Sequence, residues 1–376
     1  MRKSRFSSRV FVSIFAFALS GAAAAATPHP AGTCTPPGDT WEARADFPDT
    51  AIVRAWGAYF PPDGKFYLLG GRPDDTVGDD FTNIHIYDPA TDTWTTSAAT
   101  FADGQNNNMV GGVLDFGGTP LIVVVGGSAA GATDASSSDT RTYDPVADSL
   151  EVLTNDPWPG NTNGKILPGG AAVYENKLFV FGGFDINSSM VDTITVFDPS
   201  AAEGSRWTTM TATLPTPIGY IPTAETGGLI YLFGGSTWDA TDPNAPVLHD
   251  TTESSVYDPD TDTISPVTPI PRATAETRAV TALDGTVWVL GGGREAPNPA
   301  SEVDVYDPVG DAWTTAPAFA NPRRNFSADI DPATGNIWAV GGYDATPAPT
   351  FFNEQFTACS GPDDTIFADG FDGPPT

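Results

Sequence analysis

A short apolar segment that ends in two glycines recurs six times along the 376-residue chain. The first glycines of successive pairs lie between 50 and 57 residues apart. The pairs are Gly70-Gly71, Gly126-Gly127, Gly182-Gly183, Gly234-Gly235, Gly291-Gly292 and Gly341-Gly342. A period of this length indicates a repeat architecture, in which each repeat is one supersecondary unit that buries its apolar face against its neighbours.

A second signal, an aromatic residue followed by Asp-Pro, comes after each of the first five glycine pairs. The aromatic residues are Tyr87, Tyr143, Phe197, Tyr257 and Tyr306, and we expect them to pack in the core between neighbouring repeats. An apolar residue follows seven positions later, except in the third repeat, where a three-residue insertion moves it; these residues are Trp94, Leu150, Trp207, Ile264 and Trp313. Turn sequences such as Asp63-Gly64 and Asp-Pro-x-x-Asp divide each repeat into four short strands, here named a to d in chain order.

Six repeats of four short strands predict an all-β fold, a six-bladed β-propeller with four antiparallel strands per blade. The glycine pair, the Tyr-Asp and the following Trp resemble the Kelch repeat family over residues 39–359. The resemblance implies a secreted bacterial Kelch-repeat protein. The WD40 family fits less well, because the recurrent Gly-His and Trp-Asp pairs are missing and Trp238-Asp239 is a single case.

The sixth repeat has Phe356 at the aromatic position but no Asp-Pro and no later Trp. An unassigned segment with the sequence of a d strand, Asp39-Thr40-Trp41, precedes the first a strand. We therefore expect this N-terminal strand to close the last blade. Cys34 and Cys359 would then meet at the broken c–d turn, where a disulfide closing a loop of this length contributes roughly 5 kcal/mol.

Residues 1–26 have the layout of a cleaved secretory signal peptide. Arg2 to Arg9 are basic, Val10 to Leu19 are apolar, and Ala24-Ala25-Ala26 offers an A-x-A cleavage site. A membrane anchor is the alternative. Export to the periplasm or the extracellular space is expected, with no membrane span after cleavage. Residues 27–359 form the propeller, and residues 360–376 form an acidic flexible tail.

The charge of the chain argues against partners that are strongly negative. Asp and Glu number 47 against 17 Lys and Arg, a net charge of −30. Such a protein repels nucleic acid and anionic membrane surfaces. Hydrophobic residues reach 40%, which is enough for a packed core despite the 39 glycines and 35 prolines.

The predicted fold sorts charged residues by face. The a–b and c–d turns carry many aspartates, so the face that they share should be strongly negative. Asp258, Asp260 and Asp262 have a spacing that could suggest calcium, but no Gly or terminal Glu completes a calcium-binding loop, and an Asp that caps its own turn is the better explanation. No metal site and no cofactor are therefore expected.

Arginines gather on the opposite face, which carries the b–c and d–a loops. Arg54, Arg278 and Arg324 lie near the starts of a strands, with Arg323 beside the last. Arg72 and Arg294 follow glycine pairs. Repeats one, five and six are neighbours in a closed ring, so a carboxylate, sulfate or phosphate site is one interpretation. The other is that these arginines bond to the backbone or to acids of the adjacent blade.

The same face is expected to carry further polar and aromatic candidates. Polar side chains are Asn106, Asn107, Asn108, Asn161, Asn163 and Lys165. The side chains of Trp56, Tyr220 and Tyr343 could offer flat surfaces for binding a sugar. Of these, Asn108, Tyr220 and Tyr343 join Arg54, Arg72, Arg278, Arg294 and Arg324 as candidate ligand-binding residues.

Catalytic motifs are sparse. His29, His85 and His249 are far apart, no Gly-x-Ser-x-Gly segment occurs, and paired histidines for a copper oxidase are missing from the inner loops. Whether the chain is an enzyme stays open.

The leading prediction is a secreted, monomeric binding module. It would recognise a protein or glycan partner through the b–c and d–a loops, of which Ser236 to Ser255 is the longest. The alternative is a periplasmic sugar-processing enzyme that resembles Kelch sialic-acid mutarotases. In it, Arg54, Arg278 and Arg324 would hold an acidic sugar and Glu295 would be the acid or base.

Overall fold

A computed structural model of the chain describes residues 40–102, 104–241, 247–294 and 298–357. The predicted signal peptide, the predicted tail, Cys34, Cys359, His29 and Glu295 lie outside the described residues. Within these ranges no helix is long and apolar enough to cross a membrane.

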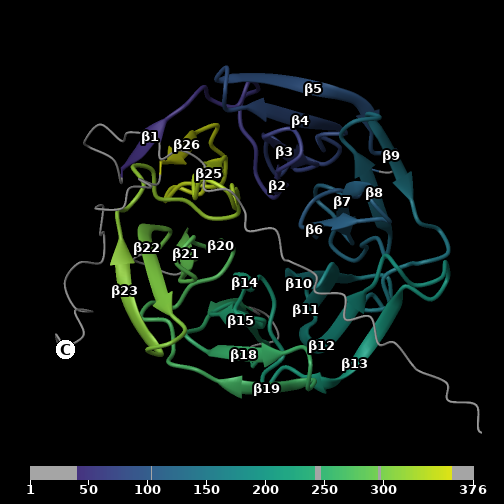
Figure 1. Ribbon diagram of the computed structural model, residues 1–376, viewed down its shortest axis with the longest axis vertical. Coiled ribbons are helices and arrows are strands. Elements are labelled where there is room, and N and C mark those ends of the chain that lie inside the picture. Colours follow the sequence, from purple (N-terminus) through teal and green to yellow (C-terminus); the bar gives the residue numbers. More distant parts are fainter. Residues whose placement is uncertain (1–39, 103, 242–246, 295–297, 358–376) are drawn as a thin grey trace, which may run out of the picture. The chain divides into compact units, whose positions relative to one another are not determined.

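Six four-stranded antiparallel sheets follow one another around a ring, as Figure 1 shows. Blade 1 consists of β2 (Trp56–Phe60), β3 (Lys65–Leu69), β4 (Asn83–Asp88) and β5 (Thr93–Thr100). Blade 2 consists of β6 (Val110–Asp115), β7 (Pro120–Val125), β8 (Thr140–Asp144) and β9 (Ser149–Val152). Blade 3 consists of β10 (Ile166–Tyr174), β11 (Lys177–Asp185), β12 (Ser189–Phe197) and β13 (Trp207–Thr213).

Blade 4 consists of β14 (Thr223–Thr226), β15 (Leu229–Phe233), β18 (Ser254–Asp258) and β19 (Thr263–Pro266). Blade 5 consists of β20 (Arg278–Thr281), β21 (Val287–Gly292), β22 (Ala300–Asp307) and β23 (Ala312–Ala316). Blade 6 consists of β24 (Ser327–Ile330), β25 (Ile337–Val340), β26 (Asn353–Phe356) and β1 (Trp41–Ala43). The six-bladed propeller predicted from the repeats is confirmed.

The N-terminal strand closes the ring as predicted. β1 pairs with β26 in the order β1-β26-β25-β24, with Trp41 opposite Phe356. The Trp41 indole N–H donates to the Pro317 carbonyl of blade 5 at 2.9 Å. The first described strand of the chain therefore completes its last blade and contacts the one before it.

The hydrophobic core consists of separate clusters at the junctions between blades. Each of the six junctions has one, because every b strand is apolar on both faces. The aromatic residue of each c strand packs into the junction with the preceding blade, as for Tyr143 against Phe60 and Tyr67 of blade 1. The prediction that these aromatic positions are inter-blade core is confirmed.

The glycine pairs allow the blades to approach closely. Gly70 has a φ of +65°, and a Cβ atom there would lie 2.1 Å from the Asn106 carbonyl oxygen of blade 2. The next residue, Gly71, donates its N–H to that same oxygen at 3.1 Å. Gly341 repeats the arrangement, with a Cβ position 2.1 Å from the Ile52 carbonyl oxygen. A side chain would therefore remove an inter-blade backbone contact.

The aspartates of the c–d turns have two roles. The first Asp of each turn caps its own backbone, as in the 2.9 Å bond from the Asp260 N–H to Asp258. The second Asp links two blades: Asp92 accepts from the Tyr87 hydroxyl at 2.6 Å and from the Ala45 N–H, before blade 1, at 2.8 Å. The equivalent residues Asp148, Asp262 and Asp311 do the same.

Candidate functional site

The innermost strands of the six blades line a central channel. These strands are β2, β6, β10, β14, β20 and β24, and the cavity between them has a volume of about 720 Å³. Its wall is largely small and apolar, with Ala172, Ala224 and Ala328 among the lining residues. Trp56, a candidate sugar platform in the sequence, lies in this wall and is 7% exposed.

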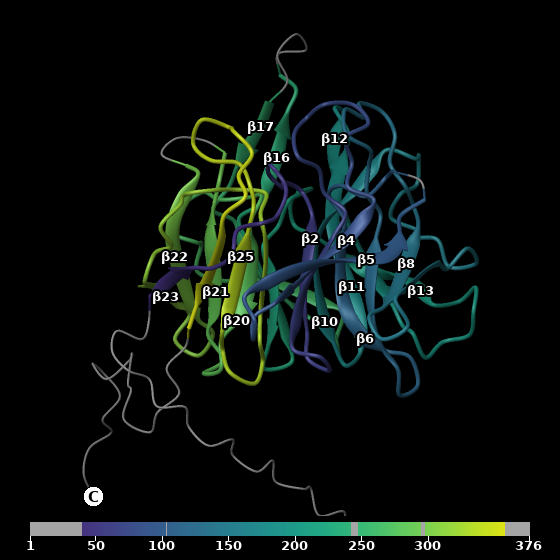
Figure 2. The same ribbon diagram turned by 90° about the horizontal axis from the view of Figure 1, so that it is seen from above.

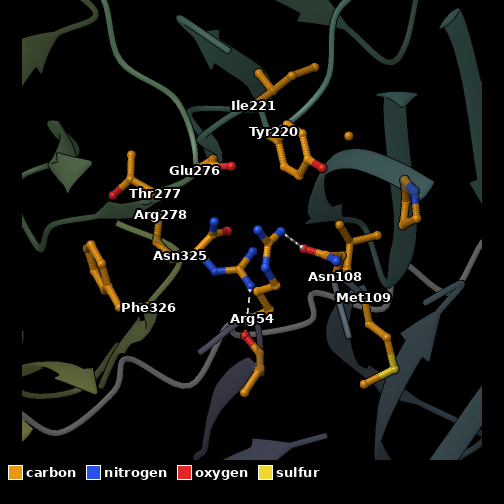
Figure 3. Close-up of a pocket in the computed structure, with 14 residues that line it drawn as sticks. Arg54, Asn108, Met109, Tyr220, Ile221, Glu276, Thr277, Arg278, Asn325 and Phe326 are labelled. Carbon is orange, nitrogen blue, oxygen red and sulfur yellow. Dashed lines mark hydrogen bonds between the residues drawn. The ribbon is translucent and has the colours of Figure 1, made fainter. Parts of the chain in front are cut away.

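One residue from each blade forms a ring at the end of the channel that carries the b–c and d–a loops. In each blade, the last apolar residue before the glycine pair lies opposite a residue in or next to the a strand, and the ring residue stands two positions before that residue. In blade 1, for example, Leu69 lies opposite Trp56, and Arg54 stands two positions before Trp56. We call this set the neck ring; its members are Arg54, Asn108, Pro168, Tyr220, Glu276 and Asn325. All six line a second cavity, of about 50 Å³, drawn in Figure 3.

Backbone hydrogen bonds join the neck ring from blade to blade. The Asn108 N–H donates to Arg54 at 3.0 Å, and the Arg54 N–H donates to Asn325 at 3.0 Å. The Asn325 N–H donates to Glu276 at 2.5 Å, and the Glu276 N–H donates to Tyr220 at 3.2 Å. These five residues have φ between 53° and 60°. The left-handed conformation costs energy in non-glycine residues, and the hydrogen bonds offset that cost.

Glu276 is the negative centre of the neck. Its side chain is fully buried and forms ion pairs with both Arg294 and Arg324. Burial opposes ionisation of the carboxyl, but Arg294, Arg324 and Arg54 outweigh it and lower the pKa of Glu276 to about 2. The carboxylate is therefore ionised at any physiological pH.

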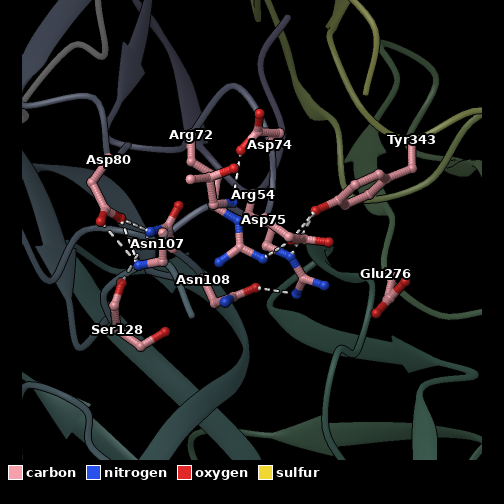
Figure 4. A network of polar contacts seen from close by, with 12 residues as sticks. Arg54, Arg72, Asp74, Asp75, Asp80, Asn107, Asn108, Ser128, Glu276 and Tyr343 are labelled. Carbon is pink, nitrogen blue, oxygen red and sulfur yellow. Dashed lines mark hydrogen bonds and ion pairs between the residues drawn. The ribbon is translucent and has the colours of Figure 1, made fainter. Parts of the chain in front are cut away.

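Arg54 lies beside Glu276 without forming an ion pair. It donates to Asn108 Oδ1 at 3.0 Å and to the Tyr343 hydroxyl at 3.4 Å, as Figure 4 shows. The Tyr343 ring packs against Arg54 and Arg324, whose guanidinium carbons lie 5.5 and 4.9 Å from its centroid. Burial disfavours the charge of Arg54, but Glu276 and Tyr343 more than compensate and raise its pKa.

Arg278 occupies the boundary between the two cavities and lines both. Its one hydrogen bond in the described part of the chain is a long one, 3.4 Å to the Ala55 carbonyl. Among the described residues, no carboxylate lies within ion-pair distance of it. Burial lowers the pKa of Arg278 to about 10, although the charge of Asp329 opposes this shift.

The remaining candidate arginines are held by acids near them. Arg72 pairs with Asp75, which also accepts from the Tyr343 hydroxyl at 2.8 Å. Arg323 is buried and pairs with Glu354 inside blade 6. The interpretation that the arginines bond to nearby acids therefore holds for only some of them. Arg54 and Arg278 converge on the neck, whereas the others form ion pairs with neighbouring acids.

Some of the other polar and aromatic candidates lie in the neck ring, and others are buried outside it. Asn108 and Tyr220 belong to the neck ring. Asn106 and Asn107 are buried and donate to the Phe81 carbonyl and to Asp80. The Tyr343 ring, only 3% exposed, is covered by arginines rather than open to a sugar.

Glu276 and Asn325 were missed in the sequence. Neither belongs to a repeated motif, because the neck ring carries a different residue in every blade. They could have been found only by their position, because both occupy the same place relative to the a strand as Arg54 and Asn108 do. The three arginines grouped as a-strand residues do not share one register, and only Arg54 belongs to the neck ring.

The described histidines are not arranged as a catalytic or metal site. His85 is buried 4.7 Å from the Phe47 ring, and burial lowers its pKa to about 4 despite the charge of Asp49. His249 lies 4.0 Å from Asp239 in the loop of blade 4. In the described ranges, no group of three or more His, Cys, Asp and Glu side chains is placed to hold a metal ion.

Comparison with known proteins finds a Kelch motif and Kelch-containing relatives. The model of the Kelch motif matches residues 277–319, which contain the four strands of blade 5. The chain is 27% identical over 179 residues to beta-scruin of Limulus polyphemus, covering 46% of this chain and 18% of that protein. It is 28% identical over 171 residues to the spermatocyte protein spe-26 of Caenorhabditis elegans, covering 44% and 28%.

A third relative is the Kelch-like protein terF of Aspergillus terreus, 27% identical over 180 residues, which cover 46% of this chain and 36% of that protein. The chain therefore spans about a third or less of the length of these relatives. With its six glycine-pair repeats, its six four-stranded blades and this motif match, the chain is similar to Kelch-repeat proteins, which supports the predicted resemblance.

Proposed function

We propose that this chain is an interaction module that binds a protein partner on the face carrying the b–c and d–a loops. Kelch-repeat propellers are typically protein-interaction modules. The observation that carries the proposal for this face is an added hairpin. It is built from β16 (Ser236–Asp239) and β17 (Val247–Asp250), which lie between the b and c strands of blade 4.

The hairpin projects beyond the blades, as the side view in Figure 2 shows. The sequence suggested a long loop here, and the structure gives that segment a regular two-stranded form. Four backbone pairs join the strands, from Ser236–Asp250 to Asp239–Val247. An ordered element loses less conformational entropy on binding than a flexible loop.

An apolar cluster supports the base of the hairpin. Trp238 packs against Phe184 of blade 3, with ring centroids 5.5 Å apart. Leu248 and Tyr220 contact the same cluster, which also contains Ile186 and Met190. The cluster connects the hairpin to the neck ring through Tyr220. A partner that contacts the hairpin would therefore also lie beside the mouth of the channel.

The experiment is affinity capture with matched surface variants. Val247 is 43% exposed on the hairpin, and Val309 is 97% exposed in the c–d turn of blade 5, on the opposite face. Val247→Asp should lose a captured protein that wild type and Val309→Asp both retain. Equal retention by the two variants, or loss only with Val309→Asp, would contradict the proposed face.

A glycan partner, an acidic sugar ligand and the sugar-processing alternative stay predictions, and Glu295 lies outside the described residues. Export to the periplasm or the extracellular space is likewise a proposal, supported by the sequence of residues 1–26. N-terminal sequencing of the secreted protein should find Thr27 first. Mass spectrometry after alkylation without reduction should find Cys34 and Cys359 unmodified and linked.

A further inference from the structure

We propose that the neck of the channel is a binding site for a small carboxylate with an apolar tail, such as a short-chain monocarboxylate. The carboxylate would lie in the 50 Å³ cavity between Arg54 and Arg278, and the tail would extend into the 720 Å³ channel. This site lies inside the channel and does not include the hairpin, so either proposal can fail without the other.

The charge balance at the neck favours an anion. Four guanidinium groups lie around the carboxylates of Glu276 and Asp329: Arg294 and Arg324 form ion pairs with Glu276, Arg54 and Arg278 line the same cavity as Glu276, and Asp329 acts on Arg278 without an ion pair. The chain as a whole has a net charge of −30, so a local excess of positive charge is contrary to its average. An anion between the two guanidinium groups would compensate that excess.

Two hydrogen-bond donors without a strong acceptor, those of Arg278 and Asn325, line the cavity beside Arg54. Figure 3 shows the Arg54 and Arg278 side chains pointing into it. Arg278 makes only its 3.4 Å bond to Ala55. The buried Nδ2 of Asn325, which lines the same cavity, has no acceptor among the described residues. A carboxylate has two oxygens and about four acceptor positions, which match two guanidinium groups and one amide.

Arg278 is difficult to explain as a structural residue. A buried charge costs free energy unless it is paired, and an apolar residue of similar volume would avoid that cost. The equivalent positions in blades 1 and 2 are Trp56 and Val110, so the fold itself accepts apolar side chains there. The nearest negative charge acting on Arg278 is Asp329, which forms no ion pair with it. An anionic ligand accounts for the residue.

The two cavities adjoin and differ in character. They share the lining residues Ile221, Thr277 and Arg278. Beyond Arg278 most of the lining residues are small or apolar, such as Ala172, Ala224 and Val280, although Glu225 and Asp329 also line the channel. A ligand that is charged at one end and apolar along its length fits this order. A phosphate or sulfate would use the neck alone.

The test is isothermal titration calorimetry of the full chain with sodium acetate, butyrate and hexanoate at constant ionic strength. Burial of each CH₂ strengthens binding by up to about fourfold. We expect hexanoate to bind at least tenfold more tightly than acetate, and hexanol and hexylammonium chloride not to bind measurably. Equal affinity for acetate and hexanoate, or no saturable binding of hexanoate, would overturn the proposal.

Variants locate the site. Arg278→Met should weaken hexanoate binding at least tenfold, whereas Arg44→Met removes the same charge at a distance and should change nothing. Asn325→Gly deletes the amide while tolerating the positive φ, and should weaken binding several-fold even if Arg278→Met fails to fold. Unchanged binding in Asn325→Gly and in a folded Arg278→Met would place the ligand elsewhere and refute the site.

Discussion

At the scale of single residues, the charged side chains at the neck of the channel differ in how well ion pairs and hydrogen bonds compensate their charges. Glu276 is shared by two arginines, Arg54 is supported by an amide and a tyrosine, and Arg278 has one weak bond. The contribution of each arrangement to the stability of the protein can be measured with a substitution.

Glu276→Gln should destabilise the propeller strongly, because it leaves the partly buried Arg294 and Arg324 without their buried negative partner. Breaking a buried ion pair in this way costs about 3–5 kcal/mol. Urea unfolding at pH 7 measures the loss, with the exposed Glu302→Gln as control. A loss below about 1 kcal/mol would show that the ion pairs do not hold the neck together.

Asp329 should make stability depend on pH near neutrality. Burial raises the pKa of Asp329 to about 6, although the Tyr59 and Ile330 N–H groups oppose the shift. A raised pKa in the folded state means that the stabilising contribution is complete below the unfolded value, about 4, and is lost as the pH rises through about 6.

Asp329→Asn should therefore be more stable than wild type at pH 7.5, by roughly 1–3 kcal/mol relative to the difference at pH 4. Urea unfolding of both proteins at the two pH values measures this. A difference that does not change with pH would show that Asp329 titrates normally.

At the scale of the element, the blades are joined by a small set of recurring contacts: the glycine pair, the aromatic residue of strand c and the second Asp of the c–d turn. Each connects a strand to the neighbouring blade. Because the same contact recurs from junction to junction, one substitution reports on the general mechanism.

Gly70→Ala should cost more than Gly64→Ala, although both glycines have a positive φ, 65° and 73°. At Gly64 the nearest atom to an added Cβ is the Tyr59 hydroxyl at 3.6 Å, so only backbone strain of about 1 kcal/mol is expected. At Gly70 the added Cβ would also clash with the Asn106 carbonyl. Chemical denaturation of both variants compares them, and equal losses would contradict a role for close approach.

Asp92 should contribute to acid sensitivity. The Tyr87 hydroxyl and the Ala45 N–H bind its carboxylate and lower the pKa of Asp92. A lowered pKa in the folded state means that its contribution is complete above the unfolded value, about 4, and is lost as the pH falls through the folded value.

Asp92→Asn keeps an acceptor and tolerates the left-handed backbone, but cannot be protonated in this range. It should therefore lose less stability than wild type between pH 6 and pH 3, as measured by thermal unfolding. If the two proteins lose equal stability, Asp92 is not part of the acid response.

At the scale of the whole molecule, the ring depends on a strand from the start of the described chain. β1 covers the edge of β26, and Trp41 contacts both Phe356 and Phe319 at centroid distances of 5.7 and 5.5 Å. An uncovered strand edge offers a template for pairing with a second molecule.

Deletion of residues 27–44 should therefore lower the unfolding midpoint and produce oligomers in size-exclusion chromatography. Trp41→Ala keeps the backbone pairing and should destabilise the protein while leaving it monomeric. A monomeric deletion variant with the stability of wild type would refute closure by β1.

The sequence by itself determined the number of blades, the four strands in each and the closing strand, because these depend on local periodicity and on turn residues that recur in every repeat. It also assigned the aromatic positions to the core. The neck depended on the tertiary structure. Arg54 belongs to blade 1 and Arg278 and Glu276 belong to blade 5, and their side chains line one cavity only because strand register and ring closure bring those positions to one axis. No local sequence pattern distinguishes the arginines that form ion pairs from those that line a cavity.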